Sequence, residues 1–527
     1  MKSLIRLLIM ASILLPGCSS NAPVIIVKVD GGKVEGIKVG DITVFKGIPF
    51  AAPPVGDLRW KAPQPVKNWI GILKADKFGL ACPQMKMNRP GIPEVEVSED
   101  CLYLNVWTPA KSSKEKLPVM VWIYGGGFAL GTTSYPLYSG EQLANLGVIL
   151  VSVAYRVGPL GFMSHPELTA ESEHHVSGNY GLLDQIAGLK WVKNNIKGFG
   201  GDPSKVTIFG ESAGAESVSM LAASTLTKGL FRGAISESGG SFGPVRKDRV
   251  MDCMQLLAGA EKSGTDFMNR MGCANLAELR KVSPDKWLND PMSQMGGFWP
   301  VVDGYVIADD QYKLYQAGKY NDVAVIIGTN SDEGSMFARP VDPDKYIEHI
   351  KLRFGPVSEK ILNLYPVDSA TGTFRPIADL FQETVFAWPS WSWAKLQSKT
   401  GRSNVFVYYF DQFNPEPFFP GGPVPKGAIH ASEIAYVFQH LDQNPAVKVT
   451  EEQRALSAMM AKYWTNFAKN GDPNGDGLPI WPKFIDGEET VLYLKGIPHT
   501  GPVANLDKLK AMDEYFAWKR NFTESGK

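Results

Sequence analysis

The stretch KVTIFGESAGAESV, residues 205–218, constrains the fold of this chain more than any other. It begins as a short apolar run typical of a buried strand and continues, with no room for a loop, as a helix. Gly210 and Gly214 flank Ser212 at the junction, and we expect a side chain at either glycine to collide as the turn tightens. Such a turn lifts the serine to the carboxyl end of the strand, beside a helix N-terminus. Ser212 is therefore a candidate nucleophile, which needs a base from elsewhere in the chain.

Short apolar runs after residue 101 predict a large sheet. They are continuous and mostly β-branched, as in strands buried on both faces: LPVMVWIY, GVILVSVAY, KVTIFG, GAISES and VAVIIG. Between them, apolar residues at helical spacing form one face of a helix that ends near KGFGGDP: Leu182, Ile186, Leu189, Val192 and Ile196. This alternation predicts an α/β fold with a mostly parallel central sheet and helices on both faces. The runs before residue 101 predict an N-terminal antiparallel meander.

The remaining segments suggest one domain with insertions. Residues 241–300 and 335–440 are irregular and rich in Pro, Gly and aromatic residues, and we interpret them as insertions over the sheet. A late helix over 451–469 carries one apolar side that core packing explains. We therefore expect a single catalytic domain over 18–527.

The N-terminus has the layout of an export signal. Within residues 1–17, Lys2 and Arg6 precede a short apolar stretch and small residues. The LPGC that ends at Cys18 resembles a bacterial lipobox and predicts lipidation of Cys18, although Pro16 is atypical and leaves ordinary cleavage as the alternative. A membrane span is disfavoured because the run is shorter than about 18–20 residues. We expect a secreted, periplasmic or outer-membrane-anchored protein.

The charge balance argues against two kinds of partner. Basic and acidic side chains number 54 each, the formal net charge is zero, and no long run of one sign occurs. Nucleic acid and anionic membrane surfaces are therefore disfavoured, which leaves an N-terminal lipid as the one expected membrane contact.

Four cysteines remain beyond Cys18, an even number for an oxidising compartment. Three pairings are possible, and we favour the sequential one because it closes two short loops: Cys82–Cys101 and Cys253–Cys273. In the chain-entropy model each disulfide stabilises the fold by about 3 kcal/mol. No pair has the CxxC spacing of a metal or redox motif.

Three glycines, 125–127, follow another buried strand in VWIYGGGFALG. Bare backbone at this point can direct N–H groups at a developing oxyanion, and a flexible turn is the alternative. Because the serine turn is also present, we expect the N–H groups of Gly126, Gly127 and Ala213 to form an oxyanion hole.

Together these features resemble the type-B carboxylesterases, the cholinesterase-like and para-nitrobenzyl-esterase-like branch of the α/β-hydrolases. The matching segments occur in the family's order: FKGIPFAAPPVGDLRWKAPQP, SEDCLYLNVWTP, GNYGLLDQIAGLKWVKNNIKGFGGDP, GESAG and GDPNG. The resemblance implies an α/β-hydrolase fold, a serine esterase that forms an acyl-enzyme, a Ser–Glu–His triad, and neither metal nor organic cofactor.

The same resemblance locates the base and the acid. GAIHASEIAYVF resembles the family's histidine loop and gives His430, and IIGTNSDEGSMF resembles its acid loop and gives Glu333. Asp332 is the competing acid, which we interpret as solvated or capping. His440 is interpreted as structural, and the adjacent His174 and His175 do not predict a metal site because their side chains diverge.

Substrate preference is less constrained. Tyr124 stands where many relatives have histidine, and the loop between Cys82 and Cys101 lacks an aromatic residue that would bind a quaternary ammonium, which argues against choline esters. Candidates for an apolar pocket, with core packing as the alternative for at least half, are Trp299, Phe381, Phe386, Trp388, Trp391 and Trp393. Glu211 is either structural or in contact with the substrate.

Two other functions remain as alternatives. The same residues would serve an amidase or a carbamate hydrolase. The family also contains adhesion proteins that have lost catalysis, but the complete set of nucleophile, acid, base and glycines in this chain favours an enzyme.

Overall fold

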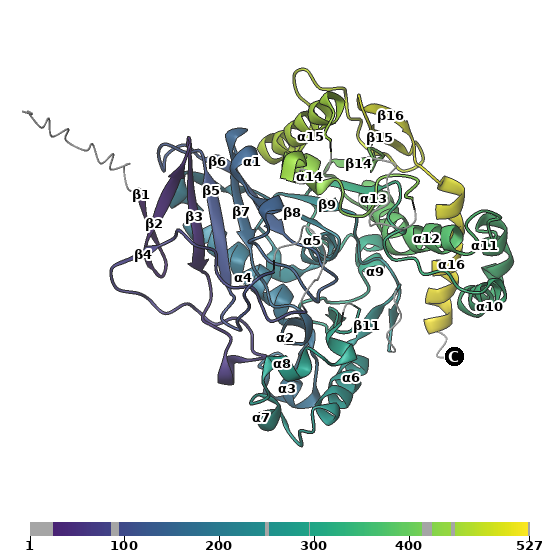
Figure 1. Cartoon of the computed structure of the whole chain (residues 1–527), viewed down its shortest axis with the longest axis horizontal. Coiled ribbons are helices and arrows are strands. Elements are labelled where there is room, and N and C mark those ends of the chain that lie inside the picture. The colour runs from purple at the N-terminus through teal and green to yellow at the C-terminus, as the bar shows by residue number, and fades with distance from the viewer. Residues whose placement is uncertain are drawn as a thin grey trace, which may run out of the picture.

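The computed structural model describes residues 25–85, 94–247, 252–294, 296–413, 424–443 and 448–524. The predicted export signal and Cys18 lie outside these ranges. Among the described residues, thirteen strands form one large sheet (Figure 1). In spatial order, twelve of them are β1 (Ile25–Val29), β2 (Gly32–Val39), β3 (Ile42–Pro49), β5 (Tyr103–Thr108), β7 (Ile149–Val153), β6 (Leu117–Ile123), β8 (Gly201–Glu211), β9 (Gly233–Glu237), β13 (Ala324–Asn330), β14 (Val405–Phe410), β15 (Thr490–Leu494) and β16 (His499–Pro502). The short β4 (Ile72–Lys74) pairs with β2.

The middle of the sheet is parallel, from β7 through β15. Strands β1, β2 and β3 form the predicted antiparallel meander, and β5 runs antiparallel to both β3 and β7. Every residue of β7 and β9 is buried, as expected for strands covered by helices on both faces. The predicted α/β class and mostly parallel sheet are confirmed.

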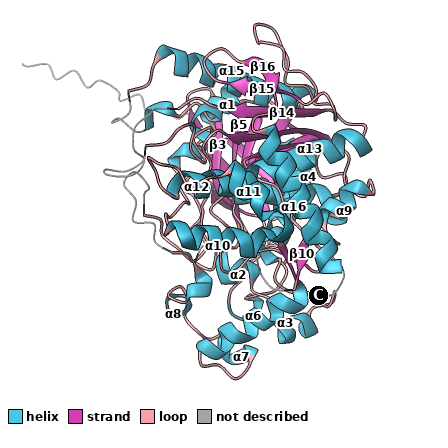
Figure 2. Cartoon of the chain, turned by 90° about the vertical axis from the view of Figure 1, so that its right-hand side faces the viewer, coloured by secondary structure: helices cyan, strands magenta, loops and turns pink. Residues whose placement is uncertain are grey.

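The helices lie on the faces of the sheet and beyond one end of it. They are α1 (Glu141–Asn145), α2 (Gly158–Phe162), α3 (Pro166–Glu171), α4 (Tyr180–Asn195), α5 (Ala213–Ala223), α6 (Leu257–Arg270), α7 (Leu276–Leu279), α8 (Pro284–Trp287), α9 (Gln311–Gln316), α10 (Pro343–Phe354), α11 (Ser358–Leu364), α12 (Phe374–Gln382), α13 (Trp388–Thr400), α14 (Ile434–Val437), α15 (Glu451–Asn470) and α16 (Leu506–Glu524). Figure 2 shows α11 and α16 in front of the sheet, with α3, α6 and α7 grouped at its lower end. No helix in the described ranges is long and apolar enough to cross a membrane.

The two longer predicted helices occur where the spacing of apolar residues places them. The first, α4, ends at Asn195, and a short 3₁₀ turn then leads to Gly200, whose left-handed backbone stops the helix. The second, α15, begins after Thr450, which caps the N–H of Gln453 while the Gln453 side chain caps Thr450. Both elements agree with the sequence prediction.

One insertion boundary needs correction. Residues 335–440 were expected to lie over the sheet, but β14 falls within them and pairs with β13 and β15 in the sheet itself. Residues 241–300 hold α6, α7, α8 and part of a separate small sheet, β10 (Val245–Arg246), β11 (Met254–Leu256) and β12 (Val301–Val302).

The predicted disulfides are not formed: all four cysteines are free thiols. Interaction with the Cys82 thiol, together with burial, raises the pKa of Cys101. Cys253 Sγ lies 3.6 Å from the Asp252 carboxylate, and Cys273 Sγ lies 3.8 Å from the Met271 carbonyl. Cys253 and Cys273 therefore contact other groups and not each other. In this structure the predicted disulfide pairing is wrong.

A buried charge network attaches α16 to the region of the small sheet. The Asp252 carboxylate accepts hydrogen bonds from Lys519 Nζ (2.7 Å), Tyr515 Oη (2.8 Å) and Arg353 Nη2 (2.9 Å). Burial would raise the pKa of Asp252, but Arg353 and Lys519 outweigh it and hold that pKa well below its usual value. The stabilisation is therefore complete above the unfolded-state pKa, about 3.9, and is lost as the pH falls below it.

Replacing Asp252 with Asn should cost about 3–5 kcal/mol of unfolding free energy at neutral pH, because Lys519 and Arg353 would keep their charges without the carboxylate. Urea unfolding measures the loss. Asp411→Asn is the matched control, since Asp411 pairs with Lys495 at the surface (2.7 Å) and such pairs contribute about 0–1 kcal/mol. Equal losses in the two variants would contradict a stabilising role for the buried network.

Candidate active site

The junction between β8 and α5 places Ser212 in a strained backbone conformation. β8 ends at Glu211 and α5 begins at Ala213, so Ser212 alone makes the turn, with φ 57° and ψ −124°. A positive φ is uncommon for a residue with a side chain and persists only where the surroundings enforce it. Here the Ser212 N–H donates to the Glu237 carbonyl of β9 (2.9 Å), and the Ser212 carbonyl accepts from the N–H of Glu216 (2.9 Å).

Glycines allow the neighbouring backbones to approach this turn. A Cβ atom on Gly210 would lie 2.5 Å from the Ile123 carbonyl oxygen, and one on Gly214 would lie 2.1 Å from the same atom. On the other side, a Cβ on Gly239 would lie 2.7 Å from the Ser212 carbonyl oxygen. The serine is therefore held between β6 and the segment after β9, which is the collision that the sequence predicts for Gly210 and Gly214.

The glycine loop after β6 lies directly beside the serine. A Cβ on Gly125 would be 2.9 Å from Ser212 Cβ. Gly126 and Gly127 have left-handed backbones, with φ 112° and 59°. Within the described part of the chain, no backbone acceptor is recorded for the N–H groups of Gly126, Gly127 or Ala213. These three predicted donors are therefore available beside the candidate nucleophile.

A buried acid–base pair lies at the same edge of the sheet. His430 Nδ1 is 2.6 Å from Glu333 Oε2, and the Glu333 side chain is completely buried. The other carboxylate oxygen, Oε1, accepts from the N–H of Asn330 (2.7 Å), and the N–H of Glu333 donates to Gln382 Oε1 (3.0 Å). Glu333 thus has one oxygen committed to the backbone and one to the imidazole.

Asp332, the competing acid, has a structural role. Its carboxylate pairs with Arg375 Nη2 (2.7 Å) and accepts from Ser335 Oγ (2.7 Å) and the N–H of Lys426 (2.9 Å). Because the side chain is fully buried, the expectation that it is solvated is wrong. His440 Nε2 donates to the Ser139 carbonyl (2.9 Å), in keeping with its structural interpretation.

Glu211 approaches the histidine from the other side. His430 Nε2 lies 3.1 Å from Glu211 Oε1, although the angles do not make this a hydrogen bond. No hydrogen bond joins His430 Nε2 to Ser212 in the described residues. The structure therefore brings Glu333, His430 and Glu211 into one cluster, and it places Ser212 next to Glu211 in the chain.

Burial and charge set the proton affinities in this cluster. Burial favours neutral imidazole, but the carboxylates of Glu211 and Glu333 outweigh it and raise the pKa of His430 to about 9. Burial raises the pKa of Glu211 to about 8, although the positive charge of His430 acts to lower it. Glu433, whose Oε2 accepts from Asn330 Nδ2 (2.5 Å), also has its pKa raised by burial and by Glu333, to about 7.

Sequence reasoning missed Asn330, Gln382 and Glu433. Glu433 follows His430 by three residues within the same motif, so its proximity could have been anticipated. Asn330 precedes Glu333 by three residues within the acid-loop motif and carries a comparable signal. Gln382 carries none, because only the folded chain brings it to the acid.

Known proteins are similar to this chain over most of its length. Residues 23–512 match the carboxylesterase family. The chain is 36% identical to the para-nitrobenzyl esterase of Bacillus subtilis (strain 168) over 89% of this chain and 94% of that protein. It is 35% identical to the fumonisin B1 esterase of Sphingopyxis macrogoltabida (88% and 85% covered) and to the human cocaine esterase (90% and 88% covered). A solved PNB esterase structure superposes with a TM-score of 0.80 at 33% identity, covering 92% of this chain and 99% of that one.

The chain belongs to the carboxylesterase family. It is a carboxylic ester hydrolase with the α/β-hydrolase fold, and its substrates are small-molecule esters.

Aromatic side chains surround the catalytic histidine candidate of this esterase. The Phe386 ring is 4.5 Å from His430 and the Phe337 ring is 5.3 Å from it, between ring centroids. Phe381, a predicted pocket residue, stacks on Phe337 at 4.8 Å and is half-buried. Trp299 packs edge-on against Phe128 of the glycine loop (4.7 Å). Phe337 was not among the predicted pocket residues.

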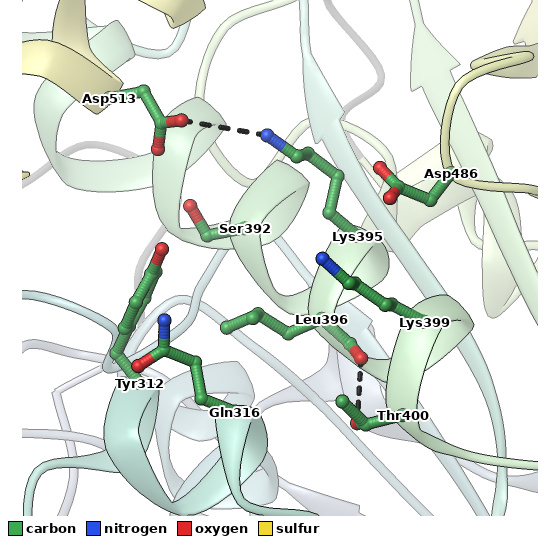
Figure 3. A pocket seen from close by; sticks show the side chains of 9 residues that line it. All are labelled: Tyr312, Gln316, Ser392, Lys395, Leu396, Lys399, Thr400, Asp486 and Asp513. Atoms are coloured by element: carbon green, nitrogen blue, oxygen red, sulfur yellow. Dashed lines mark hydrogen bonds and ion pairs between the residues drawn. The ribbon is translucent and has the colours of Figure 1, made fainter.

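The remaining predicted pocket residues are core residues. Trp388 is fully buried against Phe516 of α16 (3.9 Å), and Trp391 and Trp393 are also buried. Near them, a cavity of about 300 Å³ lies between α9, α13 and α16 (Figure 3), lined by Tyr312, Gln316, Ser392, Lys395, Leu396, Lys399, Thr400, Asp486 and Asp513. Most of these side chains are polar, and none belongs to the cluster around His430.

Replacing Gly214 with Ala should abolish folding or reduce stability by several kcal/mol, because the new methyl group would meet backbone that cannot move aside. Thermal unfolding and soluble yield measure the effect. Gly240→Ala is the control, since a Cβ there meets nothing closer than 3.4 Å. A stable and active Gly214→Ala enzyme would show that β6 and α5 do not approach as closely as described.

The pH dependence should reflect His430. Neutral imidazole is needed to accept a proton, so kcat/KM should rise with pH toward the pKa of about 9. Glu211→Gln removes the negative charge that raises this pKa most and should move the rise to lower pH. Glu433→Gln, a weaker influence on His430, should move it less. Measuring kcat/KM across neutral and alkaline pH distinguishes them, and an unmoved profile in Glu211→Gln would refute the assigned cause.

Proposed function

We propose that this chain hydrolyses carboxylic esters through an acyl-enzyme on Ser212, with His430 as the base and Glu333 as the acid. The observation that carries the proposal is the 2.6 Å contact between Glu333 and His430 at the sheet edge where Ser212 is held with a positive φ. A buried carboxylate on Nδ1 holds the imidazole in the tautomer whose Nε2 is free to accept a proton.

In the proposed reaction, Ser212 Oγ attacks the ester carbonyl carbon while His430 Nε2 takes its proton. Glu333 stabilises the resulting imidazolium, and the N–H groups of Gly126, Gly127 and Ala213 bind the oxyanion of the tetrahedral intermediate. The imidazolium then protonates the leaving alcohol, which leaves an acyl group on Ser212. Water, activated by the same imidazole, attacks the acyl carbonyl and releases the acid.

The hydrogen bond between Nδ1 and Glu333 acts as a pivot in this scheme. Nε2 faces Glu211 Oε1 at 3.1 Å, and the scheme requires it to turn about the Glu333 contact toward Ser212. Above its pKa of about 8, Glu211 then stabilises the imidazolium as a second carboxylate, so its role is electrostatic. The aromatic side chains of Phe337, Phe381 and Phe386 next to His430 favour esters with apolar or aromatic groups on at least one side.

Ser212→Ala should lower kcat for a nitrophenyl ester by at least about 10³-fold, because the remaining groups have no nucleophile to activate. Its thermal unfolding should stay close to that of the wild type. Mass spectrometry of the wild-type enzyme after treatment with an organophosphate should find the label on Ser212. A label on another residue, or near-normal turnover by Ser212→Ala, would overturn the proposal.

A panel of aryl, feruloyl, nitrophenyl and glycerol esters, with matched amides and carbamates, then defines the substrate class. Esters should be hydrolysed faster than the matched amides if the family's chemistry holds. A purely non-catalytic binding role would give no turnover of any of them.

A further inference from the structure

The glycine loop that carries the proposed oxyanion donors is held by few backbone hydrogen bonds. Residues 125–131 contain four backbones with positive φ, at Gly126, Gly127, Phe128 and Gly131. Inside the loop, the Gly126 carbonyl accepts from the N–H groups of Ala129 (3.1 Å) and Leu130 (3.2 Å). Outside it, the Phe128 carbonyl accepts from the N–H of Gly158 (2.6 Å). These bonds stabilise the turn but do not involve Gly131, where the loop ends. The backbone groups of Gly131 are bound by a different residue.

Gln84 is that residue. Its side-chain Nε2 donates to the Gly131 carbonyl (2.8 Å), and its Oε1 accepts from the N–H of Gly131 (2.8 Å). Nε2 also donates to the Cys82 carbonyl (3.0 Å), which anchors the amide to its own segment. With 5% of its surface exposed, Gln84 forms these bonds away from water, where losing them leaves polar groups without partners.

Gly131 is in direct contact with the start of the same loop. A Cβ at Gly131 would lie 2.3 Å from the Tyr124 ring and 2.8 Å from the Gly125 carbonyl oxygen. A displacement of Gly131 is therefore transmitted to Gly125 and to the N–H groups that follow it. Tyr124 itself is fixed by hydrogen bonds between its hydroxyl and the backbone of Tyr155, at 3.0 and 3.1 Å.

We propose that Gln84 is a positioning residue for ester hydrolysis: its primary amide holds both backbone groups of Gly131 and thereby fixes the oxyanion loop. The inference rests on the proposed function, because it assumes that Gly126 and Gly127 bind the oxyanion. The amide is suited to the task because it presents a donor and an acceptor in one plane. A protonated carboxylic acid of the same length would do the same, whereas a carboxylate has no proton to donate.

Gln84→Met keeps the side-chain length and removes all three side-chain hydrogen bonds, the two to Gly131 and the one to the Cys82 carbonyl. Because an ångström-scale misplacement of catalytic groups is costly, kcat should fall about 10- to 100-fold while KM changes little. Affinity for a trifluoromethyl ketone, whose adduct places an oxygen in the oxyanion hole, should fall by a similar factor. Gln397→Met is the matched control, since Gln397 is equally buried and makes two hydrogen bonds, to Trp393 Nε1 (2.8 Å) and the Val323 carbonyl (2.7 Å). It should lower stability and leave kcat near the wild-type value.

Gln84→Glu supplies a readout that a purely structural role would not move. When protonated, the new carboxyl group restores both bonds to Gly131, and when ionised it loses the donor. The ratio of its kcat/KM to that of the wild type should therefore be near one at low pH and fall as the pH rises. For Gln84→Met the corresponding ratio should be independent of pH. If Gln84→Met does not fold, the pH-dependent ratio of Gln84→Glu decides the question alone.

A pH-independent ratio for Gln84→Glu, or a kcat in Gln84→Met no lower than in Gln397→Met, would overturn the proposal. Organophosphate labelling of the wild type separates this outcome from a failure of the proposed function. If Ser212 is labelled and the Gln84 variants keep their kcat, only the role of Gln84 is wrong. If Ser212 is not labelled, the proposed function itself is wrong.

Discussion

The close approach of three backbone segments at Ser212 is the constraint on which the rest of the site depends. Gly214 packs against the end of β6 and Gly239 packs against the serine carbonyl, at distances that exclude any side chain. Between them, the chain can pass from β8 to α5 only through a residue with positive φ. The same packing places the glycine loop, which continues β6, directly beside the serine. The proposed nucleophile and the proposed oxyanion donors are therefore positioned by one steric arrangement.

Electrostatics add a second constraint. Four buried carboxylates, those of Glu211, Glu237, Glu333 and Glu433, lie close enough to influence one another's proton affinity or that of His430. Glu237 hydrogen-bonds to Trp464 Nε1 (2.7 Å), and burial raises its pKa well above the usual value. A single imidazole among carboxylates is thus stabilised as a cation, which favours the charge that the proposed reaction creates on His430. The corresponding cost is that neutral imidazole is favoured only at higher pH.

The sequence predicted those strands and helices whose burial is visible in the local spacing of apolar residues. Continuous apolar runs gave the parallel strands because both faces of that sheet are covered, and helical spacing gave α4 and α15. β14 was missed as a sheet strand because it lies among long irregular segments, although VFVYYF is strongly β-prone. Contacts such as Asn330 with Glu433, or Gln84 with Gly131, join residues far apart in the chain, and no single-sequence pattern encodes them. The disulfides were expected from an even number of cysteines, an export signal and two short loops, and the structure has free thiols instead.

The proposed reaction passes through a tetrahedral intermediate, one oxygen of which is held by backbone N–H groups that the packing around Ser212 positions. A crystal structure of the enzyme after reaction with a boronic acid tests this most directly. We expect boron bonded to Ser212 Oγ, one boronate oxygen about 3 Å from the N–H groups of Gly126, Gly127 and Ala213, and His430 Nε2 turned from Glu211 toward the adduct. A boronate on another residue, or one on Ser212 whose oxygens all face away from these N–H groups, would contradict it.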